Sequence, residues 1–91
     1  MRIIICDIWH CHDGWANSVT IFKGGKIDEA ADLKCRQQFN LWYRSARTRE
    51  GAEKRMREKI AMALSIVGNC DVAEQGSARA NEYFSAMKEA A

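Results

Sequence analysis

The sequence predicts an α+β domain in which an N-terminal antiparallel β-hairpin packs against about three α-helices. Two β-rich runs, residues 2–12 and 15–23, flank a turn signal, and the rest of the chain shows apolar residues at helical three- and four-residue spacing. Of its 91 residues, 47% are hydrophobic and 29% charged, which is the composition of a folded protein. We therefore expect a single domain, residues 1–91, with a hairpin region at 1–27 and a helical region at 28–91.

The turn between the two β-rich runs is predicted at Asp13-Gly14. An Asp-Gly pair suits a type I′ turn, in which both central residues have positive φ, and such turns are typical of two-residue hairpins. This turn places His12 opposite Trp15 and sets the other cross-strand pairs from there. Two glycines end the second strand, and a short third strand fits residues 26–27.

Both faces of this hairpin are apolar, whereas a surface hairpin usually alternates between apolar and polar residues. One face carries Ile4, Cys6, Ile8, Val19 and Ile21, and the other carries Ile3, Ile5, Trp9 and Phe22. Either helices or a partner must cover both sides, because an isolated two-stranded ribbon is marginally stable in water. The outer edge of residues 3–5 is also a template for strand addition, which includes a homodimer joined through the hairpin edge.

Two helices are expected next, each with a capping residue and an apolar stripe. The first begins after Asp28 and extends to about Ala46. The second begins after Thr48 and ends at Gly68-Asn69, where a left-handed residue stops a helix. The first stripe is Ala31, Cys35, Phe39, Trp42 and Ala46, and the second is Ala52, Met56, Ile60, Ala63 and Val67.

A third helix is predicted to begin at Asp71. The pattern Asp71-x-x-Glu74 resembles a capping box, in which the first side chain caps the helix and the fourth reaches back to it. The apolar stripe of this helix is Ala73, Gly76, Ala80, Tyr83, Phe84 and Met87.

The four cysteines are predicted to be reduced thiols and not a disulfide framework, because the chain shows no export signal. No apolar run approaches the roughly 18 residues that a membrane-spanning helix requires. We therefore expect a cytoplasmic protein with no membrane partner.

The stretch ICDIWHCHDGW raises the question of a metal or redox site. His10 and His12 would share one strand face and are the credible zinc ligands, but Cys6 lies about 13 Å from His10 along an extended strand, and the chain has no third histidine. Neighbouring Cys and His side chains would point to opposite faces, and no Cys-x-x-Cys or phosphate-binding glycine loop is present. We predict no catalytic residue, no cofactor and no metal, with a zinc-binding hairpin as an alternative.

The middle of the chain is a basic block. Nine Lys and Arg residues lie between Lys34 and Lys59 against three Glu, a net charge of +6. Such helical cations are usually a solvated face, but the aromatic residues Phe39, Trp42 and Tyr43 among them also suit phosphate contacts and base stacking. The pI of about 8.4 is below the value of about 9 typical of nucleic-acid-binding domains. The residues predicted to meet an acidic or nucleic-acid-binding surface are Arg44, Arg47, Arg49, Lys54 and Arg55.

The tip of the predicted hairpin is the second candidate surface. It gathers Trp9, His10, Trp15 and Asn17, and aromatic side chains dominate the energetics of protein interfaces. A Trp beside the turn can equally cover the helix layer, so both roles remain open.

In its size, its DGW hairpin followed by helices and its lack of a catalytic constellation, the chain resembles small phage-encoded accessory proteins, among which anti-CRISPR inhibitors are one group. The resemblance covers the overall plan and assigns no residue. It implies a non-enzymatic interaction module that binds and inhibits a larger protein or nucleoprotein machine. The alternatives are a small nucleic-acid-binding protein that uses the basic block and the zinc-binding hairpin.

Overall fold

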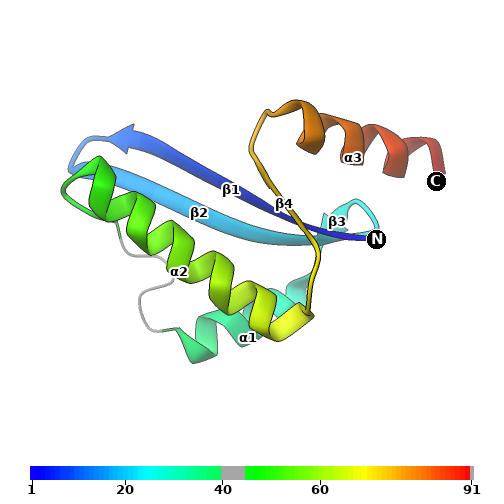
Figure 1. Ribbon diagram of the computed structural model, residues 1–91, viewed down its shortest axis with the longest axis horizontal. Helices are drawn as coiled ribbons and strands as arrows, with labels where there is room; N and C mark the ends of the chain where they lie inside the picture. Colours follow the sequence, from blue (N-terminus) through cyan, green and yellow to red (C-terminus); the bar gives the residue numbers. More distant parts are fainter. Residues whose placement is uncertain (40–44, 91) are drawn as a thin grey trace.

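The computed structural model describes residues 1–39 and 45–90 and confirms the α+β class (Figure 1). The elements are β1 Arg2–Cys11, β2 Gly14–Lys23, β3 Lys26–Ile27, α1 Glu29–Gln38, α2 Arg49–Val67, β4 Asp71–Glu74 and α3 Ala78–Ala90. A sheet with strand order β3-β2-β1-β4 is packed against helices, and β4 is parallel to β1 while the β1–β2 and β2–β3 pairs are antiparallel.

The hairpin is present, but its predicted register is wrong by two residues. Cys11 pairs with Gly14, so the central turn residues are His12 and Asp13. Neither of these two has positive φ, and the glycine follows the turn at φ 143° instead of lying within a type I′ turn. A shift of two residues preserves the alternation of side chains, and the predicted faces of the hairpin are therefore correct.

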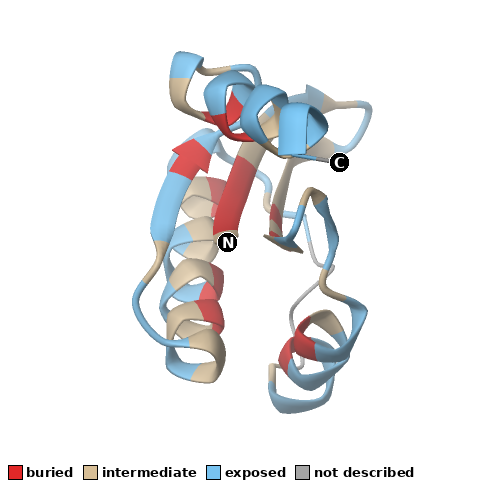
Figure 2. Ribbon diagram, turned by 90° about the vertical axis from the view of Figure 1, so that its right-hand side faces the viewer, coloured by how far each residue is buried: buried red, intermediate tan, exposed pale blue. Residues whose placement is uncertain are grey.

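Helices of the chain cover both faces of the sheet at its N-terminal half. Figure 2 shows the buried part of β1 with α3 on one side and α1 and α2 on the other. One core joins Ile4, Cys6, Val19 and Ile21 to Ala31, Cys35 and Ala63 of α1 and α2, and the second joins Ile3 and Ile5 to Ala73, Ala80 and Tyr83. The fold therefore has three layers, with the sheet between α3 and the pair α1 and α2. Both apolar faces of the hairpin are covered by these helices near the N-terminus of β1.

The first predicted helix is correct at its start and too long at its end. The Asp28 side chain accepts a hydrogen bond from the Ala31 N–H, as a capping residue should, but α1 ends at Gln38. Phe39 is already extended, and Ala46 forms an antiparallel bridge with Trp15, which a helical residue could not do. The predicted positions of Trp42, Tyr43 and Arg44 lie outside the described residues.

The second predicted helix is confirmed. The Thr48 hydroxyl accepts from the Gly51 N–H, and the chain leaves the helix at Gly68, which has φ 81°. Ala52 and Ala63 of the predicted stripe are buried, while Met56, Ile60 and Val67 pack against the first core.

The predicted helix start at Asp71 is wrong, because residues 71–74 form β4 alongside Ile3–Cys6. This pairing provides hydrogen-bond partners for the main-chain N–H and C=O groups along the apolar edge of β1. A helix at residues 71–74 would leave these groups without partners. The helix starts later, at Ala78, where the Ser77 hydroxyl accepts from the Ala80 N–H. The edge of residues 3–5, predicted from the sequence as a template for strand addition, is occupied by β4 of the same chain.

None of the described helices is long and apolar enough to cross a membrane.

Candidate functional site

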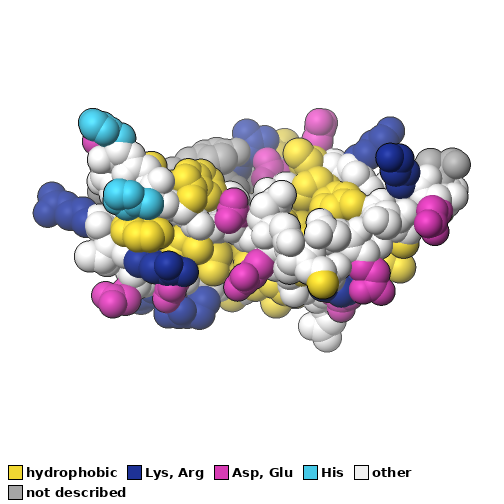
Figure 3. All heavy atoms as spheres, turned by 90° about the horizontal axis from the view of Figure 1, so that it is seen from above, with side chains coloured by type: hydrophobic (Ala, Val, Ile, Leu, Met, Phe, Trp, Pro, Cys, Tyr) yellow, Lys and Arg dark blue, Asp and Glu magenta, His cyan; other side chains and the backbone are white. Residues whose placement is uncertain are grey.

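The hairpin continues past both β4 and α3. We call residues 7–17 the hairpin end. β4 pairs with β1 only as far as Cys6, and α3 lies over the opposite half of the sheet (Figure 1). Trp9, on the face that α3 covers elsewhere, is 44% exposed. In the space-filling view the two histidines mark this projecting end (Figure 3).

A main-chain bridge joins the hairpin end to the middle of the basic block. The Trp15 N–H donates to the Ala46 carbonyl at 2.7 Å, and the Ala46 N–H donates back at 2.9 Å. The Arg49 guanidinium, three residues after the bridge, lies 5.3 Å from the centre of the Trp15 ring. The ring of His10, the cross-strand partner of Trp15, lies 5.0 Å from the same ring. Two surfaces that the sequence predicts separately therefore meet at Trp15.

The cations of the basic block are less available than their number indicates. Arg49 forms an ion pair with Glu53 at 3.1 Å, and Arg55 donates to the Ser45 carbonyl. Lys59 is buried, and burial followed by the nearby Arg55 charge lowers its pKa to about 8. Of the five cations predicted to bind a partner, Arg47, Arg49 and Lys54 are exposed and Arg55 is half-buried, while Arg44 lies outside the described residues.

Asn17 does not share the outer surface with Trp9. It is half-buried on the α2-facing side of the hairpin, opposite Ile8. Both side-chain amide atoms are buried, and neither has a hydrogen-bond partner within residues 1–39 and 45–90. Its predicted role as a direct contact residue requires a change in this packing.

The structure does not place the two histidines side by side as a strand pair. His12 belongs to the turn, whereas His10 packs against Trp15, so the predicted sharing of one strand face is wrong. Among the described residues, no three His, Cys, Asp or Glu side chains are grouped as metal ligands. Burial also raises the pKa of the Cys6, Cys35 and Cys70 thiols, which disfavours their reactive thiolate form.

A cleft of about 210 Å³ opens where β4 leaves β1. We call it the edge cleft, and it is lined by Cys6, Asp7, Ile8, Arg49, Met56, Glu74 and Gln75. Within it, an Asp7 carboxylate oxygen accepts the Ile8 N–H at 2.9 Å. The sequence pattern does not indicate this cleft, because it predicts a helix at residues 71–74, which would not place Glu74 next to β1.

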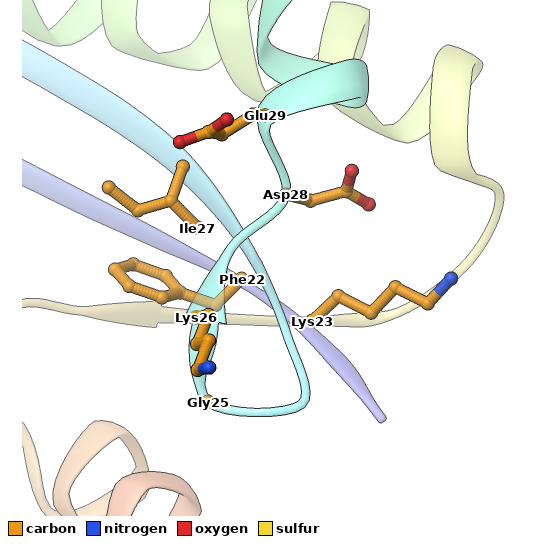
Figure 4. A pocket seen from close by; sticks show the side chains of 7 residues that line it. All are labelled: Phe22, Lys23, Gly25, Lys26, Ile27, Asp28 and Glu29. Carbon is orange, nitrogen blue, oxygen red and sulfur yellow. The ribbon is translucent and has the colours of Figure 1, made fainter.

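A wider, open hollow of about 740 Å³ lies at the other end, around β3. Figure 4 shows its lining side chains pointing in different directions and not converging on one point. Asp28, one of its two acidic lining residues, already has a structural role, because the Ala31 N–H and Arg2 hold the pKa of its carboxyl below the usual range. We therefore consider the hairpin end, with its edge cleft, the candidate functional site.

Comparison with known proteins identifies no relative. No protein-family model, curated protein or solved structure matches the chain. Its function is therefore inferred from surface geometry and chemistry.

Replacement of Gly14 by alanine tests the bridge that assembles the site. A Cβ at Gly14 would lie 2.4 Å from the Ala46 carbonyl oxygen, at a φ of 143°. We expect Gly14→Ala to break the bridge, to separate Arg49 from Trp15, and to lower the free energy of unfolding by about 2–3 kcal/mol in urea titrations. Gly24→Ala is the matched control, since its φ is 61° with no atom within 4 Å, and it should cost only about 1 kcal/mol. Equal losses in the two variants would contradict the role of the bridge.

Proposed function

We propose that this protein is a non-enzymatic interaction module that binds a larger protein or nucleoprotein machine through its hairpin end and inhibits it. The supporting observation is that Trp9 is 44% exposed on a part of the sheet that α3 leaves uncovered. Aromatic side chains, tryptophan above all, are enriched among the anchor residues of protein interfaces. The ring cluster of His10, Trp15 and Arg49 lies on the opposite face of the same hairpin end and holds it in place.

The charge layout favours a protein surface over phosphate as the main contact. Arg36 and Arg49 are already paired with Asp32 and Glu53, so part of the basic block is neutralised internally. The resemblance to small phage-encoded accessory proteins, among which anti-CRISPR inhibitors are one group, implies a larger protein or nucleoprotein machine of a host cell as the target. All four cysteines are free thiols, which fits the reducing cytoplasm of that cell.

Quantitative capture of the target tests the proposal. Immobilised protein should retain one host complex from extract. Trp9→Ala should reduce its recovery by about tenfold or more, as expected for an anchor residue. Ile27→Ala is the matched control, because Ile27 is 52% exposed at the far end of the sheet, and its recovery should be unchanged. Full recovery with Trp9→Ala would contradict the proposal.

The second candidate function is nucleic-acid binding, favoured by exposed Arg47 and Lys54, for which the described part of the chain supplies no ion pair. Phosphate contacts would make the logarithm of the affinity fall linearly with the logarithm of the salt concentration. Binding of a single-stranded oligonucleotide with such a slope, weakened by Arg47→Ala and unaffected by Trp9→Ala, would favour this candidate over the first.

A further inference from the structure

We propose that the free edge of β1 at residues 8–10 receives an extended peptide segment of the target as an added strand, with a basic side chain of that segment in the edge cleft. This inference rests on the proposed binding function and specifies what is recognised. It follows from the direction of main-chain groups, from the position where β4 ends and from the charges of the cleft.

The main-chain groups of His10 point away from β2. Its cross-strand partner Trp15 directs both its N–H and its C=O to Ala46, which lies on the other side of β2. In an antiparallel pair, opposite residues either both point toward each other or both point away. His10 therefore points its N–H and C=O to the outer edge of β1. Successive residues of a strand point these main-chain groups to alternate sides, so Ile8, two residues before His10, points them to the same edge.

β4 pairs with this edge of β1, and the pairing ends at Cys6. The Cys6 carbonyl receives the Gln75 N–H at 2.8 Å, which is the last main-chain bond between the two segments. Beyond it, no main-chain partner for Ile8 or His10 occurs in the described ranges. A peptide lying on Ile8 and His10 would thus continue the line of β4 along β1.

The Asp7 carboxylate protects this edge without closing it. It binds the Ile8 N–H, one of the outward-pointing groups. The Ile8 C=O and both main-chain groups of His10 stay available to a peptide. Edge strands of natural proteins use such charges against unselective pairing, so the edge favours a segment that also satisfies the cleft.

The cleft selects a basic side chain. In a sheet, paired residues of neighbouring strands point to the same face, so the peptide residue beside Ile8 faces α2 and enters the edge cleft. Asp7 and Glu74 line the cleft, and neither carboxylate has an ion pair with another described residue. Arg49 is engaged by Glu53, which leaves the cleft acidic, and Met56 can pack against the stem of a lysine.

Trp9 provides the second contact of the same peptide. Side chains alternate along a strand, so the peptide residues on either side of the basic one lie on the face of Trp9. An added strand would cover the exposed Trp9 ring with those residues. The preferred ligand is therefore an extended segment with apolar or β-branched residues flanking a lysine or arginine.

A titration of the isotope-labelled protein with a defined peptide tests this inference. The probe is a nine-residue peptide of alternating threonine and valine with a central lysine, capped at both ends. We expect the amide signals of Ile8, Trp9 and His10 to shift and the His10 amide to gain protection from hydrogen exchange. The same peptide with central glutamate should bind at least about fivefold more weakly.

Two controls separate strand addition from simple charge attraction. N-methylation of alternate peptide amides on the pairing side should abolish binding, because it removes main-chain donors and keeps the charge. Glu74→Gln should reduce the preference for lysine over glutamate, whereas Glu82→Gln, an exposed residue on α3, should leave it unchanged. Shifts away from residues 8–10, equal binding of the lysine and glutamate peptides, or binding that survives N-methylation would each overturn the inference.

These outcomes are independent of the capture experiment. Loss of target recovery with Trp9→Ala together with no peptide binding would keep the proposed function and reject strand addition. Unchanged recovery with Trp9→Ala would reject the proposed function itself.

Discussion

Tyr83→Ala is expected to lower the free energy of unfolding by about 3–5 kcal/mol, in line with the removal of a buried aromatic side chain. Tyr83 is 1% exposed and packs edge-to-face on Phe84 in the second core. Its hydroxyl donates to the Met1 carbonyl at 2.8 Å and accepts the Gly25 N–H at 3.0 Å. One side chain thus connects α3 to the start of β1 and to the turn before β3.

Tyr83→Phe separates these two contributions. It keeps the ring and removes the hydroxyl, so we expect a loss of about 1 kcal/mol, the net value of a typical hydrogen bond plus the cost of the groups left open. Urea unfolding of both variants gives the measurement. A loss in Tyr83→Ala no larger than that in Tyr83→Phe would contradict the claim that the buried ring holds α3 on the sheet.

Lys59→Met is expected to raise the free energy of unfolding at pH 7 by about 1–3 kcal/mol. Lys59 is 1% exposed, and burial lowers its pKa from 10.5 to about 8. That shift means that the charged amine is roughly 3 kcal/mol less stable in the folded protein than in the unfolded chain. At pH 7 Lys59 is still mostly charged, so the folded protein bears this cost. Methionine fills a similar volume without the charge. Lys54→Met, on the exposed side of the same helix, should change the stability by less than about 0.5 kcal/mol.

The pH dependence of this difference has a definite sign. Between about pH 8 and pH 10.5 the unfolded chain keeps a proton on Lys59 that the folded protein has lost, so Lys59 makes wild-type stability rise with pH. The raised pKa values of the Cys6, Cys35 and Cys70 thiols make the stability fall with pH above about pH 9. This effect is the same in wild type and in Lys59→Met. The stability gap between Lys59→Met and wild type should therefore narrow from pH 8 to pH 10.5. A constant gap would contradict a lowered pKa for Lys59.

Local signals predicted the elements whose partners are near in sequence. The Asp28 and Thr48 caps each bind an N–H three residues away. The Gly68 stop combines its own positive φ with a hydrogen bond from its N–H to the Leu64 carbonyl, four residues earlier. The alternation of the hairpin also predicted both apolar faces, although the turn was misplaced. In these cases the decisive interaction lies within a few residues, where a sequence pattern can show it.

The edge of β1 could not be predicted in this way. Cys6 contacts Ala73 across a separation of 67 residues, and no local pattern in residues 71–74 indicates a strand. The pattern Asp71-x-x-Glu74 fits a capping box, but residues 71–74 instead pair with the apolar edge of β1. The edge cleft could not be predicted either, because it forms where β4 ends before the end of β1, and β4 itself was not predicted.

Hydrogen exchange of individual amides tests most directly whether the hairpin end is an open surface. The Ile4 amide lies within the β1–β4 pairing, and the His10 amide lies beyond it on the same edge. We expect the His10 amide to be protected at least about a hundredfold less than the Ile4 amide, as is typical of an unpaired edge compared with a buried strand. Equal protection of the two amides would show that the β1 edge at His10 is already paired, and would contradict the hairpin end as a free binding surface.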